Sequence, residues 1–147
     1  MKTKILLTAF LLCTVWMAYG QWTYTNLTEA KSFMGSVALG TKVYFAGGYN
    51  GTACTSLVEV YDFTDGTWGT AGNLSVAREL LSGTTTCGSK IFFAGGYNMN
   101  FETLNTVDIY DTLTQLWTME QLSAERVSIA SVSYGTKVLF AGGIQVD

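Results

Sequence analysis

The sequence contains no histidine and no proline, and charged residues make up only 13% of its 147 residues. Without histidine, the chain cannot supply the imidazole base of a serine or cysteine hydrolase. Lys and Arg residues are scattered and form no basic cluster, whereas binding to phosphates needs grouped cations. The sequence therefore excludes nucleic acid as a partner and has no recognisable catalytic constellation. We expect no metal and no cofactor.

Glycine, aromatic and β-branched residues are abundant instead. There are 16 Gly, 8 Tyr, 8 Phe and 4 Trp residues. Valine, threonine and aromatic side chains favour pleated strands, and low charge disfavours disorder. The composition predicts an all-β chain.

Residues 1–20 have the layout of a secretory signal peptide. Lys2 and Lys4 precede an apolar run of about 14 residues, which is followed by the small residues Ala18 and Gly20. A bilayer span needs about 20 residues, so a retained membrane anchor is disfavoured. We expect cleavage after Gly20 and a secreted protein, extracellular or periplasmic, with no membrane span. Residues 21–147 then carry six Lys and Arg against 11 Asp and Glu, a net charge of −5.

One segment recurs three times along the chain. Its copies are TKVYFAGGYN (41–50), SKIFFAGGYN (89–98) and TKVLFAGG (136–143). The spacing is 48 and then 47 residues, for glycine pairs formed by Gly47 and Gly48, Gly95 and Gly96, and Gly142 and Gly143. A period of this length indicates a repeat architecture.

A second marker keeps the same period. LVEVYDFTDGTW (57–68) aligns with TVDIYDTLTQLW (106–117), which matches Tyr61 to Tyr110 and Trp68 to Trp117. Each tyrosine stands seven residues before its tryptophan. Period-two patterning and turn residues predict four strands in one unit, at about 79–86, 90–95, 104–111 and 116–119. Four-stranded units repeating every 40 to 50 residues are typical of propeller blades.

The combination of glycine pair, tyrosine and tryptophan resembles the kelch repeat family. The resemblance implies an all-β fold of kelch-type β-propeller blades, each a four-stranded antiparallel sheet. It divides the kelch repeat region, 21–147, into a leading strand at about 21–26, a first blade at about 27–71, a second at about 73–120 and a partial third at about 122–147.

The motif residues have a packing explanation of their own. Glycine in a strand lets a neighbouring backbone or ring approach closely, and large aromatic side chains fill the space between sheets. We therefore interpret the glycine pairs and Tyr61, Trp68, Tyr110 and Trp117 as structural. A carbohydrate-stacking role is the alternative for the aromatic residues.

About two and a half blades cannot close a propeller, which has at least four. An open array would expose apolar faces and strand edges. Two explanations remain open: a longer chain supplies the missing blades, or copies of this chain associate.

The strand order predicts a recognition rim. The first strand of each blade starts at the same rim as the loop between its second and third strands. In kelch proteins partners often bind there, so the resemblance makes ligand-binding candidates of Lys31, Arg78, Arg126, Tyr49, Asn50, Tyr97 and Asn98. Alternatively, the cations are solvated and the Tyr-Asn pairs only shape a turn.

Cysteines and sequons complete the candidate sites. Cys54 and Cys87 fall on opposite rims, separated by roughly 17 Å of strand, so no disulfide is expected. The sequons at Asn26, Asn50 and Asn73 are glycosylation candidates in a eukaryotic host.

Two functions compete. A third hypothesis is that the chain is a structural fragment without activity. The first is a secreted noncatalytic module that binds a protein or carbohydrate partner through its rim. The second is part of a kelch-type enzyme, either galactose oxidase-like, whose copper needs histidine, or a sialic acid mutarotase. For the mutarotase, only Arg78, Glu79, Glu125 and Arg126 are suggestive.

Overall fold

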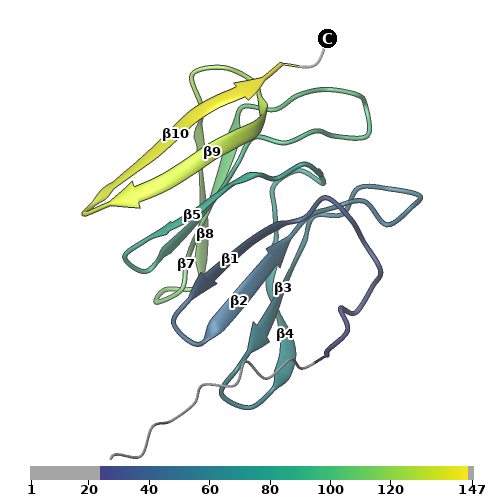
Figure 1. Cartoon of the computed structure of the whole chain (residues 1–147), viewed down its shortest axis with the longest axis vertical. Coiled ribbons are helices and arrows are strands. Elements are labelled where there is room, and N and C mark those ends of the chain that lie inside the picture. The colour runs from purple at the N-terminus through teal and green to yellow at the C-terminus, as the bar shows by residue number, and fades with distance from the viewer. Residues whose placement is uncertain (1–23, 146–147) are drawn as a thin grey trace, which may run out of the picture.

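The computed structural model describes residues 24–145, which form ten strands in three antiparallel sheets (Figure 1). Each sheet is built from consecutive strands, in the order in which they follow along the chain. The predicted all-β fold with kelch-like blades is confirmed. The predicted signal peptide lies outside the described residues, and residues 24–145 include no helix that could cross a bilayer.

Two sheets are complete four-stranded blades. Blade 1 consists of β1 (Gly35–Leu39), β2 (Lys42–Ala46), β3 (Leu57–Asp62) and β4 (Thr67–Asn73). Blade 2 consists of β5 (Gly83–Cys87), β6 (Lys90–Ala94), β7 (Thr106–Asp111) and β8 (Leu116–Gln121). Blade 3 is a hairpin of β9 (Val127–Tyr134) and β10 (Lys137–Ile144).

The first strands of the three blades lie side by side. β1 contacts β5, and β5 contacts β9, so the sheets fan out from a common inner edge (Figure 1). The turns joining β1 to β2 and β3 to β4 lie on one rim, which we call the turn rim. The loops joining β2 to β3 and β6 to β7 lie on the opposite rim, which we call the loop rim.

Two strand boundaries differ from the sequence prediction. The strand predicted at 79–86 begins only at Gly83, because Leu80 has a φ of 57° and turns the chain out of the sheet. The leading strand predicted at 21–26 is described only from Tyr24 onward, and Tyr24–Asn26 carry no strand.

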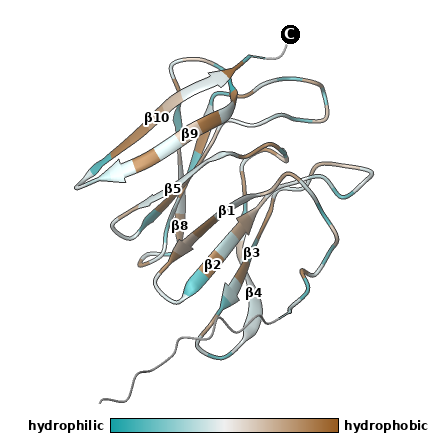
Figure 2. Cartoon of the chain, in the orientation of Figure 1, coloured by the Kyte–Doolittle hydropathy of each residue, from teal (hydrophilic) through white to brown (hydrophobic). Residues whose placement is uncertain are grey.

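The main core lies between blades 1 and 2. Along β2, Lys42 is exposed while Tyr44 and Ala46 are buried, so one face of the strand points inward. The buried cluster joins Tyr44, Ala46 and Val58 to Leu74, Leu81, Ile91, Phe93 and Tyr110. The same alternation of apolar and polar residues appears as brown and pale bands along β9 (Figure 2). Packing between neighbouring sheets therefore contributes to the stability of the array.

The first glycine of the pairs in blades 1 and 2 makes room for the next blade. Gly47 and Gly95 have φ angles of 64° and 67°, in the region that favours glycine. A Cβ on Gly47 would stand 2.4 Å from the carbonyl oxygen of Arg78, and one on Gly95 would stand 2.3 Å from that of Arg126. In each pair, the second glycine donates its N–H to that same carbonyl. The repeated pair is therefore a joint between blades.

Aromatic residues pack across the same boundary. The Tyr110 ring lies 4.9 Å from that of Trp117 and 6.2 Å from that of Tyr44 in blade 1. Trp117 stacks on Phe93 and donates its indole N–H to the carbonyl of Ala71, 2.8 Å away. These residues therefore lie in the packing between blades.

The equivalent residues of blade 1 face the preceding segment. Tyr61 and Trp68 are half-buried, with their ring centroids 5.1 Å apart. Trp68 donates its indole N–H to Thr25 Oγ1 over 2.8 Å, just as Trp117 donates to Ala71. Thr25 thus takes the place of a fourth-strand residue, although no strand is formed there.

Candidate functional site

The loop rim brings together the segments that the strand order predicted. Tyr49 pairs with Ser32 ahead of β1 and with Cys54 in its own loop. In blade 2, Tyr97 pairs in the same way with Glu79 and Thr103. The two tyrosines therefore tie each loop to the start of the first strand.

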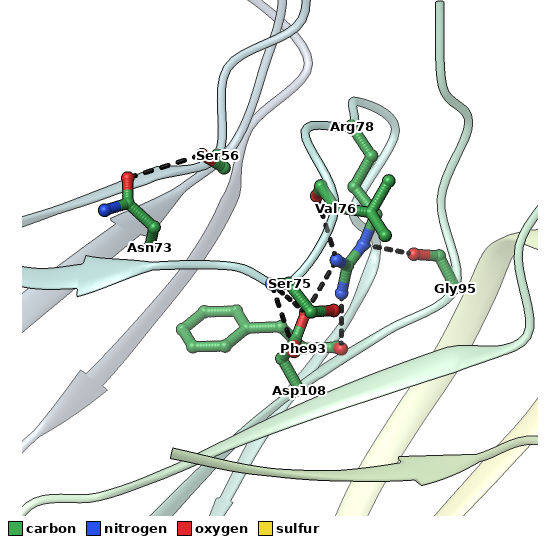
Figure 3. A network of polar contacts seen from close by, with 8 residues as sticks. All are labelled: Ser56, Asn73, Ser75, Val76, Arg78, Phe93, Gly95 and Asp108. Atoms are coloured by element: carbon green, nitrogen blue, oxygen red, sulfur yellow. Dashed lines mark hydrogen bonds and ion pairs between the residues drawn. The ribbon is translucent and has the colours of Figure 1, made fainter. Parts of the chain in front are cut away.

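Arg78 lies inside blade 2 and not on the loop rim. Its side chain is fully buried, and Nη1 lies 2.7 Å from Asp108 Oδ2 (Figure 3). Its guanidinium also donates to the carbonyls of Gly95, Phe93 and Val76. Burial lowers the pKa of Arg78, and Asp108 opposes that shift. Because no ligand can reach this side chain, the prediction that Arg78 belongs to the recognition surface is wrong.

Lys31 has the same enclosed position in blade 1. Its ammonium group pairs with the Glu59 carboxylate, and both side chains are buried. Glu59 also accepts the backbone N–H of Thr28 at 2.8 Å. Burial raises the pKa of Glu59, but the hydrogen bonds from Lys31 and Thr28 outweigh it, so the pKa falls below its usual value. The prediction that Lys31 contacts a ligand is also wrong.

Arg126 is the third cation of the set and is half-buried. It donates to the carbonyls of Gly142, at 2.8 Å, and of Ala124, at 3.4 Å. Sequence reasoning treated the three cations as a surface set, and it missed the acids at Glu59 and Asp108. The sequence did contain a signal for these acids, because both stand two residues before the repeated tyrosine.

The two asparagines of the loop rim shape their own loops. Asn50 Oδ1 accepts the backbone N–H groups of Thr52 and Ala53, at 3.0 and 2.9 Å. Asn98 Oδ1 accepts those of Asn100 and Glu102, at 3.0 and 3.1 Å. These are turn-forming contacts of the kind that asparagine commonly makes. The structure thus favours the turn alternative for both residues.

The two tyrosines are partly engaged as well. Tyr49 donates its hydroxyl to the carbonyl of Gly51, 2.9 Å away. Tyr97 is half-buried, and its ring meets that of Phe101 edge-on at 6.2 Å. Both rings retain exposed surface on the loop rim.

The most exposed apolar side chains of this rim are ones that sequence reasoning missed. Phe101 is 77% exposed, Phe33 59% and Met99 46%. Phe33, Leu80 and Ser128 occupy one position in the three units and share a left-handed backbone, with φ angles of 56°, 57° and 56°. Each stands two residues after the buried cation or its equivalent. Repeat alignment could have grouped them, but not their backbone conformation.

These residues are connected across the blades. The N–H of Leu80 donates to the carbonyl of Phe33 at 2.9 Å, and the adjacent Glu79 pairs with Tyr97, which contacts Phe101. A shallow groove follows this line, bordered by Phe33, Met34, Leu80, Leu81, Ser82 and Ser128. The side chains change from blade to blade while the backbone repeats.

The cysteines and sequons occupy separate places. Cys54 and Cys87 are both free, and Cys87 Sγ lies 3.4 Å from the carbonyl oxygen of Gly135. Burial raises the pKa of the Cys54 thiol. The asparagines of the three sequons, Asn26, Asn50 and Asn73, are exposed. Their glycosylation remains a prediction.

Within residues 24–145, no group of three His, Cys, Asp or Glu side chains could hold a metal ion. Of the four mutarotase candidates, Arg78 is enclosed and Arg126 is bound to carbonyls, while Glu79 is half-buried and Glu125 exposed. They form no ion pair with one another in this part of the chain. The candidates therefore do not assemble into a site.

Comparison with known proteins decides the family. The Kelch motif family matches residues 30–75 and 81–121, which correspond to blades 1 and 2. The chain belongs to the kelch repeat family. Kelch domains generally serve as binding modules. Blade 3 lies outside the two matched ranges, although its glycine pair and its joint with blade 2 follow the same kelch pattern.

A protein of Arabidopsis thaliana named for an F-box and kelch repeats is 35% identical over 94 residues. The match covers 63% of this chain and 26% of the relative. The kelch chain thus spans about a quarter of the length of that relative.

Proposed function

We propose that this kelch region is a secreted, noncatalytic binding module that recognises a protein partner through its loop rim. The observation that carries the proposal is the exposure of Phe33 and Phe101 on one rim of adjacent blades. Aromatic and Met side chains are enriched in protein interfaces, and monomers expose few large apolar patches. A carbohydrate partner is the alternative outcome of the test.

Backbone conformation supports a function for the same positions. Phe33 and Phe101 adopt φ angles of 56° and 63°, which cost a residue with a side chain about 1–2 kcal/mol each. Such strain often accompanies functional positions. Neither side chain gains burial in return.

An enzyme is less well supported by the arrangement of charges. A mutarotase would need cations and carboxylates facing a common space, and Arg78 is enclosed by its own blade. Titration of N-acetylneuraminic acid with the protein, followed by NMR, should leave anomer exchange unaccelerated. Acceleration that depends on Glu79 or Glu125 would restore the enzyme alternative.

The binding proposal is tested with a photo-crosslinking phenylalanine analogue. Placed at Phe33 or Phe101, it should yield adducts of defined mass in fluids of the source organism. Phe63 provides a matched control, because it is 65% exposed but lies in the turn between β3 and β4, on the turn rim. Equal adducts at Phe63, or none at the loop-rim positions, would count against the proposal.

Serine substitutions supply a second measurement. Phe33→Ser combined with Phe101→Ser should abolish capture of the crosslinked partner, while Phe63→Ser should retain it. Digestion of the adduct identifies it as peptide or glycan. Unchanged thermal unfolding of both variants separates lost recognition from lost folding.

A further inference from the structure

A cleft opens between blades 1 and 2 on the turn rim, on the opposite side of the molecule from the loop rim. It has two adjoining parts, with volumes of about 300 and about 420 Å³, and small-molecule sites commonly measure about 300–1,000 Å³. Four residues border both parts: Lys42 and Tyr44 from blade 1, and Tyr110 and Gln115 from blade 2. Both blades therefore contribute polar groups to one space.

Two tyrosine hydroxyls reach into this cleft. Tyr44 and Tyr110 are only 5% and 9% exposed, and their ring centroids lie 6.2 Å apart. Neither hydroxyl has a hydrogen-bond partner in the part of the chain that the structure describes, and both side chains line the cleft. Because the hydroxyl of a buried tyrosine usually finds a partner, the two groups indicate a ligand with polar atoms.

Charged side chains stand beside the two hydroxyls. Lys42 Nζ pairs with Asp62 Oδ2 over 3.2 Å. Burial raises the pKa of Tyr44, Lys42 opposes that shift, and Tyr110 and Asp62 add to it. Since such influences weaken with distance, these four groups lie around the same space.

The row of residues that forms one wall of the cleft differs from its counterpart in the next blade. Tyr44 on β2 lies opposite Val60 on β3, which lies opposite Gly69 on β4. The same row in blade 2 consists of Phe92, Ile109 and Thr118. Blade 1 thus has an added hydroxyl on its second strand and no side chain on its fourth. The repeat does not require either feature.

Gly69 is not needed for the backbone conformation. Its φ lies outside the left-handed region, and a Cβ there would meet no atom within 4 Å. A glycine inside a strand weakens it and commonly marks a bulge or the close approach of a ligand or a backbone. The irregularity of β4 lies further along, between Thr70 and Gly72, and no backbone lies against Gly69. Gly69 therefore keeps space open in the cleft.

We propose that this cleft binds a neutral monosaccharide unit, with the hydroxyls of Tyr44 and Tyr110 as its central contacts. Each hydroxyl of a sugar both donates and accepts hydrogen bonds, and tyrosine hydroxyls and the Gln115 amide do the same. The cleft is separate from the loop rim, so this proposal does not rest on the proposed function.

The charges around the cleft select a ligand without net charge. An anionic ligand would face the carboxylates of Asp62 and Asp65, and a cationic ligand would face the ammonium group of Lys42. Leu39 and Val60 supply apolar surface, against which the C–H groups of a sugar ring can pack. Mixed donors and acceptors with apolar walls are the usual composition of a site for a small polar ligand.

Saturation-transfer NMR with the full secreted chain tests the proposal. The probes are the methyl glycosides of glucose, mannose, galactose and N-acetylglucosamine. For each sugar that binds, the uronic acid and the amino sugar of the same configuration add one negative or one positive charge. At least one neutral glycoside should receive saturation, and its charged counterparts should bind about tenfold more weakly, because a desolvated charge is costly without a partner.

Two substitutions copy residues of blade 2 into blade 1. Tyr44→Phe removes one hydroxyl, and Gly69→Thr fills the open space. Both variants should fold, because the repeat accepts Phe92 and Thr118 at these positions. Tyr44→Phe should weaken binding about fivefold and Gly69→Thr about tenfold or more. Tyr61→Phe is the matched control, because adjacent strand residues face opposite sides of the sheet, and it should bind like the parent.

Several results would overturn the proposal. Absence of saturation transfer to all four neutral glycosides, or tighter binding of a charged counterpart, would exclude a neutral sugar as the ligand. Equal binding by the parent, Tyr44→Phe and Gly69→Thr would place the sugar outside the cleft. The double variant Phe33→Ser with Phe101→Ser should bind sugar normally, and loss of binding there would place the sugar on the loop rim. Unchanged circular dichroism spectra show that the variants are folded.

Discussion

Arg78 and Asp108 form an ion pair enclosed in blade 2, with Nη1 2.7 Å from Oδ2 and side-chain exposures of 0% and 3%. The pair connects the segment between blades to the third strand, 30 residues away. Since Arg78 also donates to the carbonyls of Gly95 and Phe93, one side chain joins three parts of the blade. Its role is structural, and this explains why the same position recurs in each unit.

Breaking this pair should destabilise the protein severely. Asp108→Leu leaves a buried guanidinium unpaired, and Arg78→Met leaves a buried carboxylate and three carbonyls without that donor. Each change should lower the free energy of unfolding in urea by about 3–5 kcal/mol. The double variant should lose less than the sum of the two. An additive result would mean that the pair makes no specific contribution.

Alanine substitutions of three glycines should separate backbone strain from blade contact. Gly88, Gly95 and Gly142 all have positive φ, but only Gly95 would place its Cβ against a neighbouring backbone. Gly88→Ala and Gly142→Ala should cost about 1–2 kcal/mol of unfolding free energy from strain alone. Gly95→Ala should cost about 3 kcal/mol or more, because overpacking adds to strain. Equal losses in all three would contradict the joint between blades.

Acid should weaken the turn between β3 and β4. Hydrogen bonds from Thr64, with smaller help from Lys42, lower the pKa of Asp62 to about 2. The pKa is below that of the unfolded chain, so the stabilisation is complete above about pH 4 and is lost as pH falls towards 2. An NMR titration of the Asp62 carboxyl should give its midpoint near 2. Asp62→Asn should remove this part of the acid sensitivity, and a midpoint near 4 would refute the assignment.

Secretion should leave a chain that begins at Gln21. The positively charged start, the apolar run and the small residues before this position predict cleavage after Gly20. Intact-mass measurement and N-terminal sequencing of the protein exported by its own host check this. Replacing Leu6 and Leu7 by aspartate should retain the protein in the cell. Export of that variant, or an uncleaved mass, would contradict the prediction.

The repeat pattern was sufficient to predict the blades, because side-chain alternation and turn residues are local features of the sequence. Strand patterning and turn residues placed β6, β7 and β8 to within two residues. The start of β5 was missed, because Leu80 adopts a left-handed backbone that no propensity of leucine indicates. That conformation depends on contacts with the neighbouring blade, which sequence periodicity does not report.

The sequence by itself determined the repeat length, the strand order and the rim on which each loop lies, since these follow from chain direction and side-chain alternation. Only the tertiary structure decided which polar residues are inside. Lys31 and Arg78 look like surface cations in the sequence, yet each is buried, because an acid on the third strand of its own blade meets it there. Arg126 has the same surroundings without that acid among the described residues. Whether such a cation is exposed or buried therefore depends on whether the folded blade places an acid opposite it.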